Sequence, residues 1–429
     1  MKICVYGLWH LGSVTAACLA EAGFQVIGLD NDVEVVKNLA QGRPPLFEPG
    51  LEALIKKGLA ADALTFTADA LIAVKEADAV WITFDTPVDE DDRADTTFIL
   101  DQIQAVFPHL KDQAIVLISS QMPVGSTAAL EKSFLNDARG RHVEFAYSPE
   151  NLRLGRAIEV FKAPGRIVIG TRNDRTRAAL TPLLERFCDT LLWISVESAE
   201  MSKHALNAFL ATSVTFINEI ATLCERVGAD AAEVEAALRS EPRIGKHAYI
   251  RPGTAFAGGT LARDVAFLTE IAKNRALEVP LLDAVLPSNR AHQNWAFRQL
   301  SSCLKDLRKK EIAVLGLSYK PGTDTLRRSS AVELCRNLAD AGATVRAYDP
   351  AVRRLPGDLQ AVVLCPDMAT TVQGADALVV ATEWPEFKNM KTDVIGSRMR
   401  RPLIIDQNRF LPAPTADSKV EYVTLGKPL

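Results

Sequence analysis

The order of hydrophobic and polar residues predicts one long buried helix, at residues 198–228. No proline or glycine interrupts this stretch before Gly228, and apolar residues would lie nearly all round the helix. Ser198 suits the N-cap, Glu200 suits the positive end of the helix dipole, and Gly228 suits the position after the last turn. At 1.5 Å per residue the helix would be about 40 Å long. We therefore expect other elements to cover it.

Two polar residues interrupt this apolar surface near the start of the helix. Lys203 and Asn207 stand four residues apart, so they share one face. Buried polar groups need partners, and a bound ligand could supply one.

The N-terminal stretch has the pattern of a dinucleotide-binding unit. An apolar run at residues 3–6 ends at Gly7, a helical pattern runs up to Gly23, and a second apolar run at residues 25–29 ends at Asp30. This strand, glycine turn, helix and strand, followed by an acidic residue that can hold ribose hydroxyls, is typical of NAD-binding folds.

The glycine fingerprint of that unit departs from G-x-G-x-x-G at its middle position. It reads Gly7, Trp9 and Gly12, and the middle glycine is the one that lets the backbone approach a pyrophosphate. A Rossmann-like scaffold that holds no dinucleotide therefore stays an open alternative.

The same pattern restarts at residue 311, with an apolar run that ends at Gly316 and a later one that ends at Asp349. Further strands are predicted at residues 79–83, 114–119, 143–147, 166–170, 377–382 and 403–406. Alternation with helices predicts an α/β fold of two Rossmann-like, doubly wound parallel-sheet domains joined by the long helix, with a ligand cleft between them. We expect three domains. Residues 1–197 would bind the dinucleotide, residues 198–300 would hold the long helix and a helical dimerisation and substrate region, and residues 301–429 would bind the nucleotide-sugar.

Composition narrows the functional classes. The 429 residues are 48% hydrophobic with a net charge of −4, which gives no basic footprint and argues against nucleic acid as a partner. Seven cysteines are scattered singly, as in a reducing compartment, and no run is long and apolar enough for a spanning helix. Because the first residues enter a strand pattern rather than a signal peptide, we expect a cytoplasmic protein with no membrane partner.

Two loops are candidate ligand contacts. Thr86 follows the strand at residues 79–83, at the end of a parallel strand where such sheets bind ligands. Residues 243–264 are rich in glycine, arginine and aromatic side chains, which suits a nucleotide or a phosphate. A plain loop between helices is the alternative interpretation of the second segment.

Collinear motifs resemble those of the UDP-glucose/GDP-mannose dehydrogenase family, the nucleotide-sugar dehydrogenases, over nearly the whole chain. The matching stretches are LAQGRPPLFEPGLEAL, DTP at 85–87, MPVGST, YSPENLRLG, GRIVIG, AEMSKHALNAFLA, EPRIGKHAYIRPG, AGGTLARDV, GLSYKPGTDTLRRSS, YDP, ATEWPEF and DQNRF.

The resemblance implies an NAD-dependent oxidoreductase of a UDP-sugar or related nucleotide-sugar, a homodimer whose long helices pack across a two-fold axis, no metal, and a place in polysaccharide precursor synthesis. The implied catalytic residues are Lys203, Asn207, Asp264, Glu150 and Thr260, the last at the family's cysteine position. The implied cofactor-binding residues are Gly7, Leu11, Gly12, Asp30, Thr86, Gln121, Arg263 and Arg327. The implied substrate-binding residues are Arg243, which would reach the neighbouring subunit's ligand, and Tyr249, Arg251, Gly253, Phe256, Gly258 and Lys320.

The departures from the family pattern gather at cofactor and catalytic positions. Family members oxidise a primary alcohol to a carboxylate with two NAD, through a thioester on the cysteine that Thr260 replaces, and Leu154 replaces a glutamate. A hydroxyl without a dedicated base cannot take the thiol's role. Three interpretations follow: an active enzyme without the thioester step, an ordinary UDP-glucose 6-dehydrogenase, or a non-catalytic nucleotide-sugar-binding protein, which Trp9 and Asp85 favour.

Overall fold

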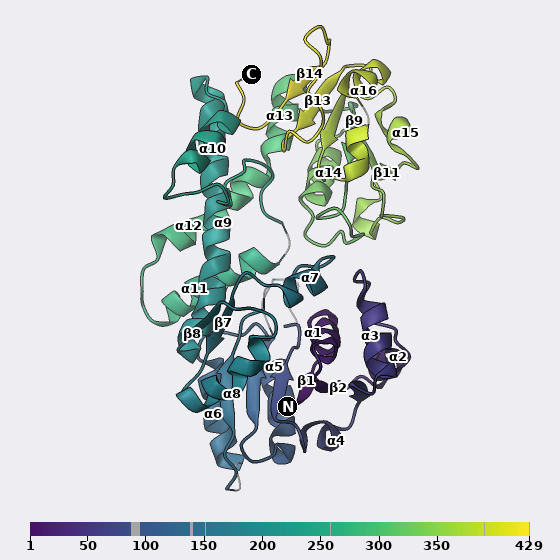
Figure 1. Cartoon of the computed structure of the whole chain (residues 1–429). Coiled ribbons are helices and arrows are strands. Elements are labelled where there is room, and N and C mark those ends of the chain that lie inside the picture. Colours follow the sequence, from purple (N-terminus) through teal and green to yellow (C-terminus); the bar gives the residue numbers. More distant parts are fainter. Residues whose placement is uncertain (87–94, 138–139, 151, 258, 390, 429) are drawn as a thin grey trace. The chain divides into compact units, whose positions relative to one another are not determined.

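The structure is a computed structural model that describes all residues except 87–94, 138–139, 151, 258, 390 and 429. The chain divides into two compact units, Met1–Ala205 and Leu206–Leu429, and each is described by itself (Figure 1).

Unit 1 is built on an eight-stranded sheet with the strand order β3-β2-β1-β4-β5-β6-β7-β8. The strands are β1 (Lys2–Tyr6), β2 (Gln25–Leu29), β3 (Leu64–Thr67), β4 (Ala79–Ile82), β5 (Ile115–Ile118), β6 (Glu144–Tyr147), β7 (Ile167–Gly170) and β8 (Leu191–Ile194). The helices are α1 (His10–Glu21), α2 (Val33–Ala40), α3 (Leu51–Ala60), α4 (Ala70–Val74), α5 (Thr96–Val106), α6 (Ser126–Asp137), α7 (Ala157–Lys162) and α8 (Asp174–Leu184). Every pairing is parallel except that of β6 with β7, which is antiparallel and departs from the predicted all-parallel sheet.

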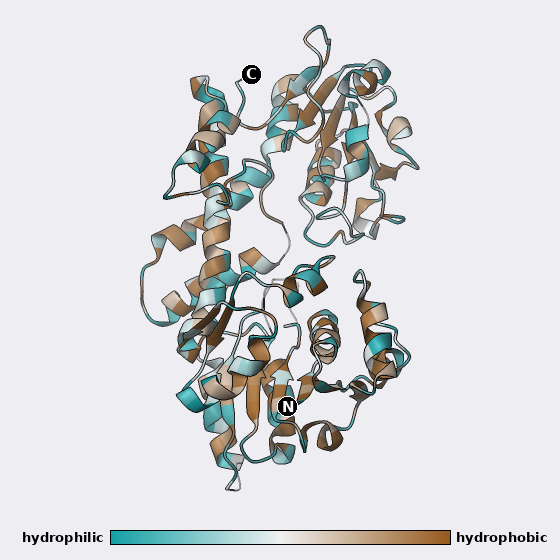
Figure 2. Ribbon diagram, in the orientation of Figure 1, coloured by the Kyte–Doolittle hydropathy of each residue, from teal (hydrophilic) through white to brown (hydrophobic). Residues whose placement is uncertain are grey.

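Hydrophobic side chains cover both faces of this sheet. Successive residues of a strand point to opposite faces, and along β1 the side chains of Ile3 and Val5 join one apolar cluster while Cys4 and Tyr6 join another. Figure 2 shows the hydrophobic strands between helices whose outer faces are more polar. A sheet covered on both faces in this way is typical of α/β folds.

Unit 2 repeats the architecture with a six-stranded, wholly parallel sheet in the order β11-β10-β9-β12-β13-β14. The strands are β9 (Glu311–Leu315), β10 (Thr344–Tyr348), β11 (Val362–Leu364), β12 (Ala377–Val380), β13 (Leu403–Asp406) and β14 (Glu421–Val423). The helices are α10 (Ala231–Ser240), α11 (Thr260–Asn274), α12 (Pro280–Gln293), α13 (Trp295–Leu304), α14 (Ser330–Asp340), α15 (Met368–Val372) and α16 (Thr392–Arg398). The order matches that of β3 to β6 in unit 1, so the predicted internal repeat and the predicted fold class are confirmed.

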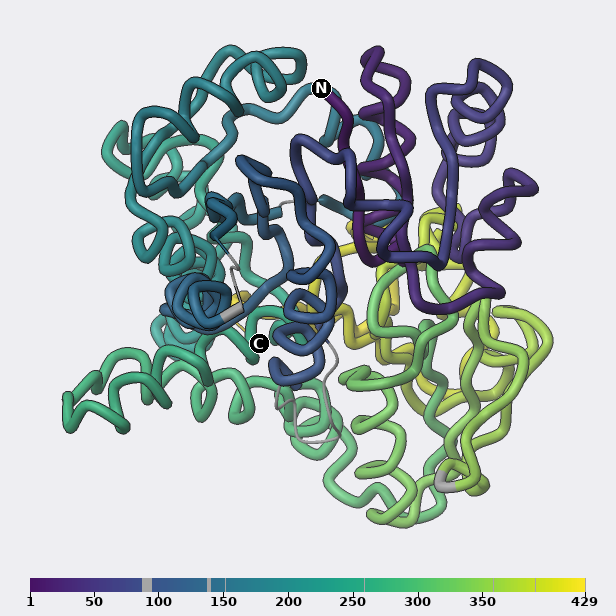
Figure 3. Tube along the Cα trace, turned by 90° about the horizontal axis from the view of Figure 1, so that it is seen from below, coloured from purple at the N-terminus to yellow at the C-terminus, as the bar shows by residue number. Residues whose placement is uncertain are grey.

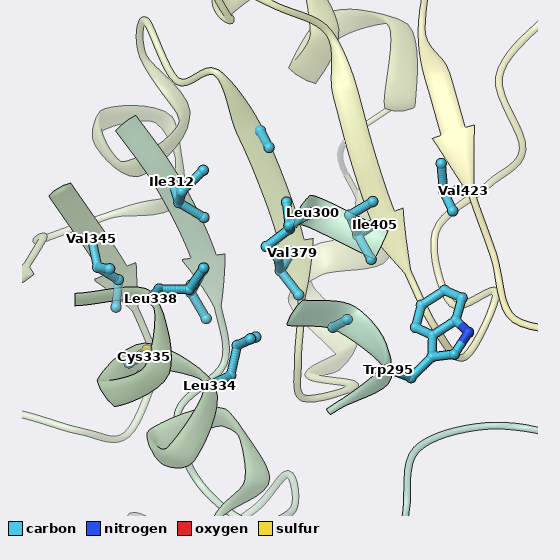
Figure 4. Close-up of a cluster of buried hydrophobic side chains, with 14 of the residues drawn as sticks. Trp295, Leu300, Ile312, Leu334, Cys335, Leu338, Val345, Val379, Ile405 and Val423 are labelled. Atoms are coloured by element: carbon cyan, nitrogen blue, oxygen red, sulfur yellow. The ribbon is translucent and has the colours of Figure 1, made fainter. Parts of the chain in front are cut away.

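One face of the second sheet carries the largest buried cluster of unit 2. Figure 4 shows it between α13 and α14 and the strands, with Trp295, Leu300, Ile312, Leu334, Cys335, Leu338, Val345, Val379, Ile405 and Val423 pointing toward one another.

The predicted long helix is α9 (Val196–Val227), and it begins two residues earlier than expected. Ser198 is therefore not the N-cap: its amide donates to the hydroxyl of Ser195 at 3.3 Å, which is the capping contact. The C-terminal end agrees with the prediction, since Gly228 has a φ of 79° and the amide of Ala229 closes back on the carbonyl of Cys224 at 3.2 Å.

The expectation that α9 is covered on all sides is wrong for a single chain. Phe209 is 68% exposed, Phe216 49% and Leu223 61%. By length and composition α9 is also the one helix in the described part of the chain that could cross a membrane. This is weak evidence, because the core helix of a soluble protein passes the same test.

The glycine turn of unit 2 is closed by Asp349, which is 1% exposed. One carboxylate oxygen accepts from the amide of Leu317 at 2.7 Å, from the amide and hydroxyl of Ser318 at 2.9 Å and from the indole of Trp384 at 3.1 Å. The other accepts from the amides of Ala351 at 2.9 Å and Val352 at 3.2 Å. Burial alone would raise the pKa of Asp349, but the hydrogen bonds, chiefly from the amides of Ser318 and Leu317, outweigh it and lower the pKa.

Replacement of Asp349 by asparagine is expected to destabilise unit 2 by about 2 kcal/mol or more at pH 7, because several amides lose a charged acceptor. The folded pKa lies below the unfolded one, so this contribution is complete above about pH 4 and is lost as the pH falls through the folded pKa. Urea unfolding of the wild-type chain and Asp349→Asn from pH 7 to 3.5 should therefore give a difference that narrows with acid. Asp340→Asn, at an exposed position of α14, is the control. Equal stability of Asp349→Asn and the control at pH 7 would contradict the account.

Candidate functional site

The turn between β1 and α1 has the geometry that the dinucleotide fingerprint requires of its first and third glycines. Gly7 has a φ of 95°, and its amide donates to the carbonyl of Leu29 at 2.9 Å. A Cβ atom at Gly12 would lie 1.8 Å from the carbonyl oxygen of Gly7, so only glycine lets α1 pack this closely on the turn.

Trp9, at the middle fingerprint position, introduces no backbone strain. Its φ is −69°, which any residue adopts, and it is 48% exposed at the N-cap of α1, whereas Leu11 is buried. The hydroxyl of Ser13 donates to the carbonyl of Trp9 at 2.7 Å, which fixes the first turn of the helix. The indole therefore lies outside the packed core.

Asp30 faces this turn and keeps capacity for a ligand. Its Oδ2 accepts from the amide of Leu8 at 2.6 Å and its Oδ1 from the amide of Asp32 at 3.0 Å. A carboxylate has about four acceptor positions, so each oxygen retains one that suits a ribose hydroxyl. In Asp349 those positions are already filled, which makes the turn of unit 1 the better dinucleotide site.

The residues of unit 1 fit NAD. The N-terminus of α1 suits a pyrophosphate because its free amides and dipole favour anions, and Asp30 suits the ribose. The loops after β4 and β5 also meet, since the Thr86 hydroxyl donates to the carbonyl of Gln121 at 2.5 Å. The structure therefore brings together the predicted cofactor residues Gly7, Leu11, Gly12 and Asp30 at one turn, and Thr86 and Gln121 at the neighbouring strand ends.

Lys203 has a partner inside unit 1. Its Nζ donates to the carbonyl of Glu150 at 2.7 Å and lies 3.6 Å from the Oε1 atom of the same residue. The Lys203 side chain is 11% exposed, and the carboxylate of Glu150 also accepts from the amide of Leu152 at 2.7 Å. Lys203 and Glu150, both predicted as catalytic, thus form an ion pair in the loop after β6. Leu154, four residues after Glu150 in the sequence, is 42% exposed.

Glu200 has a different role from the one predicted. It is fully buried, and its carboxylate accepts from the amide of Gly125 at 2.6 Å, from the amide of Thr127 at 2.9 Å and from the Thr127 hydroxyl at 2.7 Å. Glu200 therefore attaches the start of α6 to α9, and its carboxylate does not act on the dipole of its own helix.

In unit 2, the amide of Asn207 donates to the carboxylate of Asp264, and both side chains are buried. Asp264 lies on α11, four residues after Thr260, which is the exposed first residue of that helix. Positions four apart share one helix face. Thr260 and Asp264 therefore share one face of α11, and Asn207 of α9 binds Asp264 there. Arg263, the residue before Asp264, lies on a neighbouring face of α11.

A pocket of about 600 Å³ lies at the carboxyl ends of the strands of unit 2. Five predicted substrate-binding residues line it, namely Tyr249, Arg251, Gly253, Phe256 and Lys320. The Arg251 guanidinium donates to a Glu383 carboxylate oxygen at 3.3 Å and to the carbonyl of Asn408 at 2.9 Å. Exposed cations and an aromatic ring around a pocket of this size suit a nucleotide.

Three asparagines hold the glycine-rich loop of this pocket. The amide of Gly253 donates to Asn218 at 3.0 Å, and Asn289 both accepts from the amide of Phe256 and donates to its carbonyl, at 3.0 Å each. A Cβ atom at Gly253 would lie 2.5 Å from the side-chain oxygen of Asn408. The loop is therefore fixed before any ligand arrives.

The remaining predicted residues are not gathered at these sites. Arg243 is 87% exposed and pairs with Glu241 at 2.9 Å, and Arg327 is exposed in the loop before α14. Gly258 lies outside the described residues. Among the residues that the structure describes, no group of His, Cys, Asp or Glu side chains is placed to hold a metal ion.

All seven cysteines are free thiols, and the structure describes each of them. Six are buried and Cys303 is half-buried. Burial raises the pKa of Cys18 and of Cys335 to about 12, so these thiols stay protonated at neutral pH. Cys335 lies inside the apolar cluster of Figure 4, and within unit 2 none of the four cysteines lines the pocket.

Sequence-based reasoning missed several residues that shape these sites. Asn218 and Asn289 have no motif of their own, whereas Asn408 lies in the DQNRF stretch. His10 and Glu48, which form a hydrogen bond with each other, went unassigned although Glu48 lies in a matched stretch. The run Glu48, Pro49 and Gly50 and the DQNRF stretch are the signals that could have pointed to Glu48 and Asn408.

Three family models match the chain in order: the NAD-binding domain of the UDP-glucose/GDP-mannose dehydrogenase family at residues 1–188, its central domain at 197–291 and its UDP-binding domain at 313–413. The UDP-glucose 6-dehydrogenase of Pseudomonas aeruginosa is 34% identical over 100% of this chain and 98% of its own, and TuaD of Bacillus subtilis, a UDP-glucose 6-dehydrogenase, is 32% identical over 100% and 93%.

Solved structures give the same assignment. The UDP-glucose dehydrogenase from Pyrobaculum islandicum superposes with a TM-score of 0.85 at 30% identity, over 99% of this chain and 96% of its own. The UDP-D-ManNAc dehydrogenase from Pyrococcus horikoshii also has a TM-score of 0.85, at 27% identity and 99% coverage of each chain. The chain therefore belongs to the UDP-glucose/GDP-mannose dehydrogenase family and carries its NAD-binding domain.

Proposed function

We propose that the protein is an NAD-dependent oxidoreductase that acts on an alcohol of a UDP-sugar without the thioester step. The observation that carries the proposal is the arrangement at the start of α11, where Thr260 precedes the Asp264–Asn207 pair by one turn and no thiol of unit 2 lines the pocket. The family membership and the paired polar groups support hydride transfer, and the missing thiol argues against covalent capture.

The first oxidation requires few groups from the protein. Bound NAD would accept the hydride. Lys203 supplies a fixed positive charge that stabilises a developing alkoxide, and its bond to the carbonyl of Glu150 holds the ammonium in place. Asp264, held by the amide of Asn207, is the candidate acceptor of the alcohol proton.

The second oxidation lacks its nucleophile. The hydroxyl of Thr260 is not a nucleophile at neutral pH without a base, so it would not add to a new aldehyde to form the hemiacetal that a second hydride transfer would convert into an ester. The reaction then ends at an aldehyde or ketone, or it continues by direct oxidation of the hydrate. In neither case does the substrate become attached to the protein.

A second candidate function is the ordinary UDP-glucose 6-dehydrogenase reaction, which the names of the relatives favour. A non-catalytic sensor is the third interpretation. Its support is the exposed Trp9 at the middle fingerprint position. Two polar pairs, Lys203 with Glu150 in unit 1 and Asn207 with Asp264 in unit 2, argue for an enzyme, because a protein without catalytic function need not keep them.

We further propose that the protein is cytoplasmic, forms a homodimer and makes polysaccharide precursors. Its proposed domains are residues 1–197, 198–300 and 301–429. The free thiols suit a reducing compartment. Phe209, Phe216 and Leu223 follow one another at intervals of seven residues on α9 and are all exposed, which suits a seam between two copies of the helix.

With NAD and a panel of UDP-, GDP- and TDP-sugars, one NADH per sugar consumed is expected for a reaction that ends at the aldehyde or ketone. Thr260→Cys places a thiol at the start of α11, so the ratio should rise toward two and the variant should become sensitive to iodoacetamide, whereas Thr260→Ser should keep a ratio of one. NADH formation and sugar consumption are read in the same reaction. Two NADH per sugar with a covalent sugar adduct on the wild-type chain would favour the ordinary reaction, and two NADH without an adduct would mean that the hydrate is oxidised directly. No NADH despite sugar binding would favour the sensor.

Lys203→Met should lower turnover by about 10²-fold or more, because a fixed charge at a developing alkoxide is lost. The thermal midpoint should fall by only a few degrees, at roughly 2–4 °C per kcal/mol for a domain of this size. Arg226→Met, at the exposed far end of the same helix, is the control. If stability and turnover collapse together, Lys203 is structural and the proposed role is wrong.

The double substitution Phe216→Glu and Leu223→Glu should convert the dimer into monomers, because charges would replace apolar surface in the seam. Sedimentation velocity at micromolar concentration gives the mass, with Glu233→Lys on α10 as a surface control. A wild-type chain that sediments as a monomer would refute the dimer.

A further inference from the structure

Glu48 is a buried carboxylate that neither the cofactor site nor the nucleotide pocket uses directly. Its side chain is 1% exposed, and it lies in the turn of Glu48, Pro49 and Gly50 that starts α3. An ionised group taken out of water is costly unless hydrogen bonds compensate it, so its partners indicate why the fold keeps it.

The partners of Glu48 belong to two segments far apart in the sequence. Oε1 accepts from the amide of Ala157 at 2.9 Å, and Oε2 accepts from the amide of Gly155 at 2.8 Å and from Nε2 of His10 at 2.9 Å. Because a carboxylate only accepts, His10 must carry its proton on Nε2. One carboxylate therefore joins the first residue of α1 to the loop that enters α7.

The backbone around these contacts favours the arrangement. Gly155 has a φ of 87°, and Gly50 has a φ of 82°, so both turns use conformations that suit glycine. A Cβ atom at Gly50 would lie 3.7 Å from the side chain of Ile158, which places α7 directly on the turn. Helix α1 packs against both α3 and α7, and α1 and α3 run side by side in Figures 1 and 3.

The two ends of this connection are functionally distinct. His10 begins the helix whose N-terminus suits the NAD pyrophosphate, and it follows Trp9, the departure from the fingerprint. Gly155 ends the loop that starts at Ser148 and holds Glu150, whose carbonyl binds Lys203. The contacts through Glu48 thus connect the cofactor turn to the loop that positions Lys203.

We propose that Glu48 is a positioning residue that, through His10, couples the NAD-binding turn to the loop that carries Glu150. The inference rests on the proposed function where it concerns catalysis by Lys203. Its main consequence is a change in the affinity for NAD, which can be measured without turnover. Loss of Glu48 frees both the start of α1 and the loop, whereas loss of the His10 donor frees only α1.

Four variants separate the effect on the start of α1 from the effect on the loop that carries Glu150. Glu48→Gln cannot accept from all three donors, and His10→Phe keeps a ring but donates nothing. His10→Gln keeps an amide N–H that can still donate to Glu48, so it is the rescue. Glu52→Gln removes the same charge four residues along, from an exposed ion pair with Lys56, and is the matched control.

The dissociation constant for NAD, measured by calorimetry on the full chain, should rise about tenfold in Glu48→Gln and in His10→Phe, as expected for loss of a hydrogen bond to a charged group. It should change less than twofold in His10→Gln and Glu52→Gln. Hydrogen–deuterium exchange at the amides of Gly155 and Ala157 should accelerate in Glu48→Gln and stay slow in His10→Phe. Addition of NAD should slow exchange of that peptide in the wild-type chain and less so in His10→Phe.

Two results would overturn the coupling. If His10→Phe binds NAD within twofold of the control, the contact does not reach the cofactor turn, and this holds even if Glu48→Gln fails to fold. If His10→Gln is as impaired as His10→Phe, the donor is not what matters. A wild-type chain that binds NAD but oxidises no nucleotide-sugar would refute the proposed function while leaving this test intact.

Discussion

Each unit depends on a carboxylate that closes the turn after its first strand. In unit 1, Asp30 accepts from the amide of Leu8 at 2.6 Å, and in unit 2 Asp349 accepts from the amide of Leu317 at 2.7 Å. The contact fixes the glycine turn to the end of the second strand, so it sets where each helix begins. Asp30 keeps acceptor positions for a ribose, whereas Asp349 also binds Ser318 and Trp384 and has none to spare. One motif, present twice, thus gives a dinucleotide site in one unit and a closed structural turn in the other.

The departures from the family pattern leave the fold intact, and in the proposed function they change the chemistry. Trp9 lies exposed on an unstrained backbone, so it alters the approach to the turn without disturbing the packing of α1 at Gly12. Thr260 occupies the exposed start of α11, where a hydroxyl costs no core contact. In the proposed function this hydroxyl stands in place of a thiol nucleophile. Asp264 and Asn207 are buried and bonded to each other, so the polar pair beside Thr260 persists. Sites of this kind can lose one reaction step while they keep substrate and cofactor binding.

The sequence predicted the elements that carry strong periodic patterns and missed those held by tertiary contacts. The four strands that no pattern indicated, β3, β8, β11 and β14, are the edges of their sheets. Each is three or four residues long, and an apolar run as short as LLWI or VVL has no periodicity that identifies it as a strand. Ser198 looked like an N-cap, but Ser195 was available one turn earlier. The sequence suggests a role on the helix dipole for Glu200 and none for Glu48, but both are buried and accept hydrogen bonds from amides more than 70 residues away. No local pattern encodes such partners.

Covalent capture is the point on which the proposed chemistry depends most directly. The decisive measurement is the intact mass of the protein after a single turnover with NAD and its UDP-sugar, quenched in acid, with the mass of the sugar product read from the same sample. The account predicts an unmodified protein and a product two hydrogens lighter than the substrate, or an acid formed with no adduct. A sugar attached to the chain through an acyl bond, followed by release of a uronate, would contradict it.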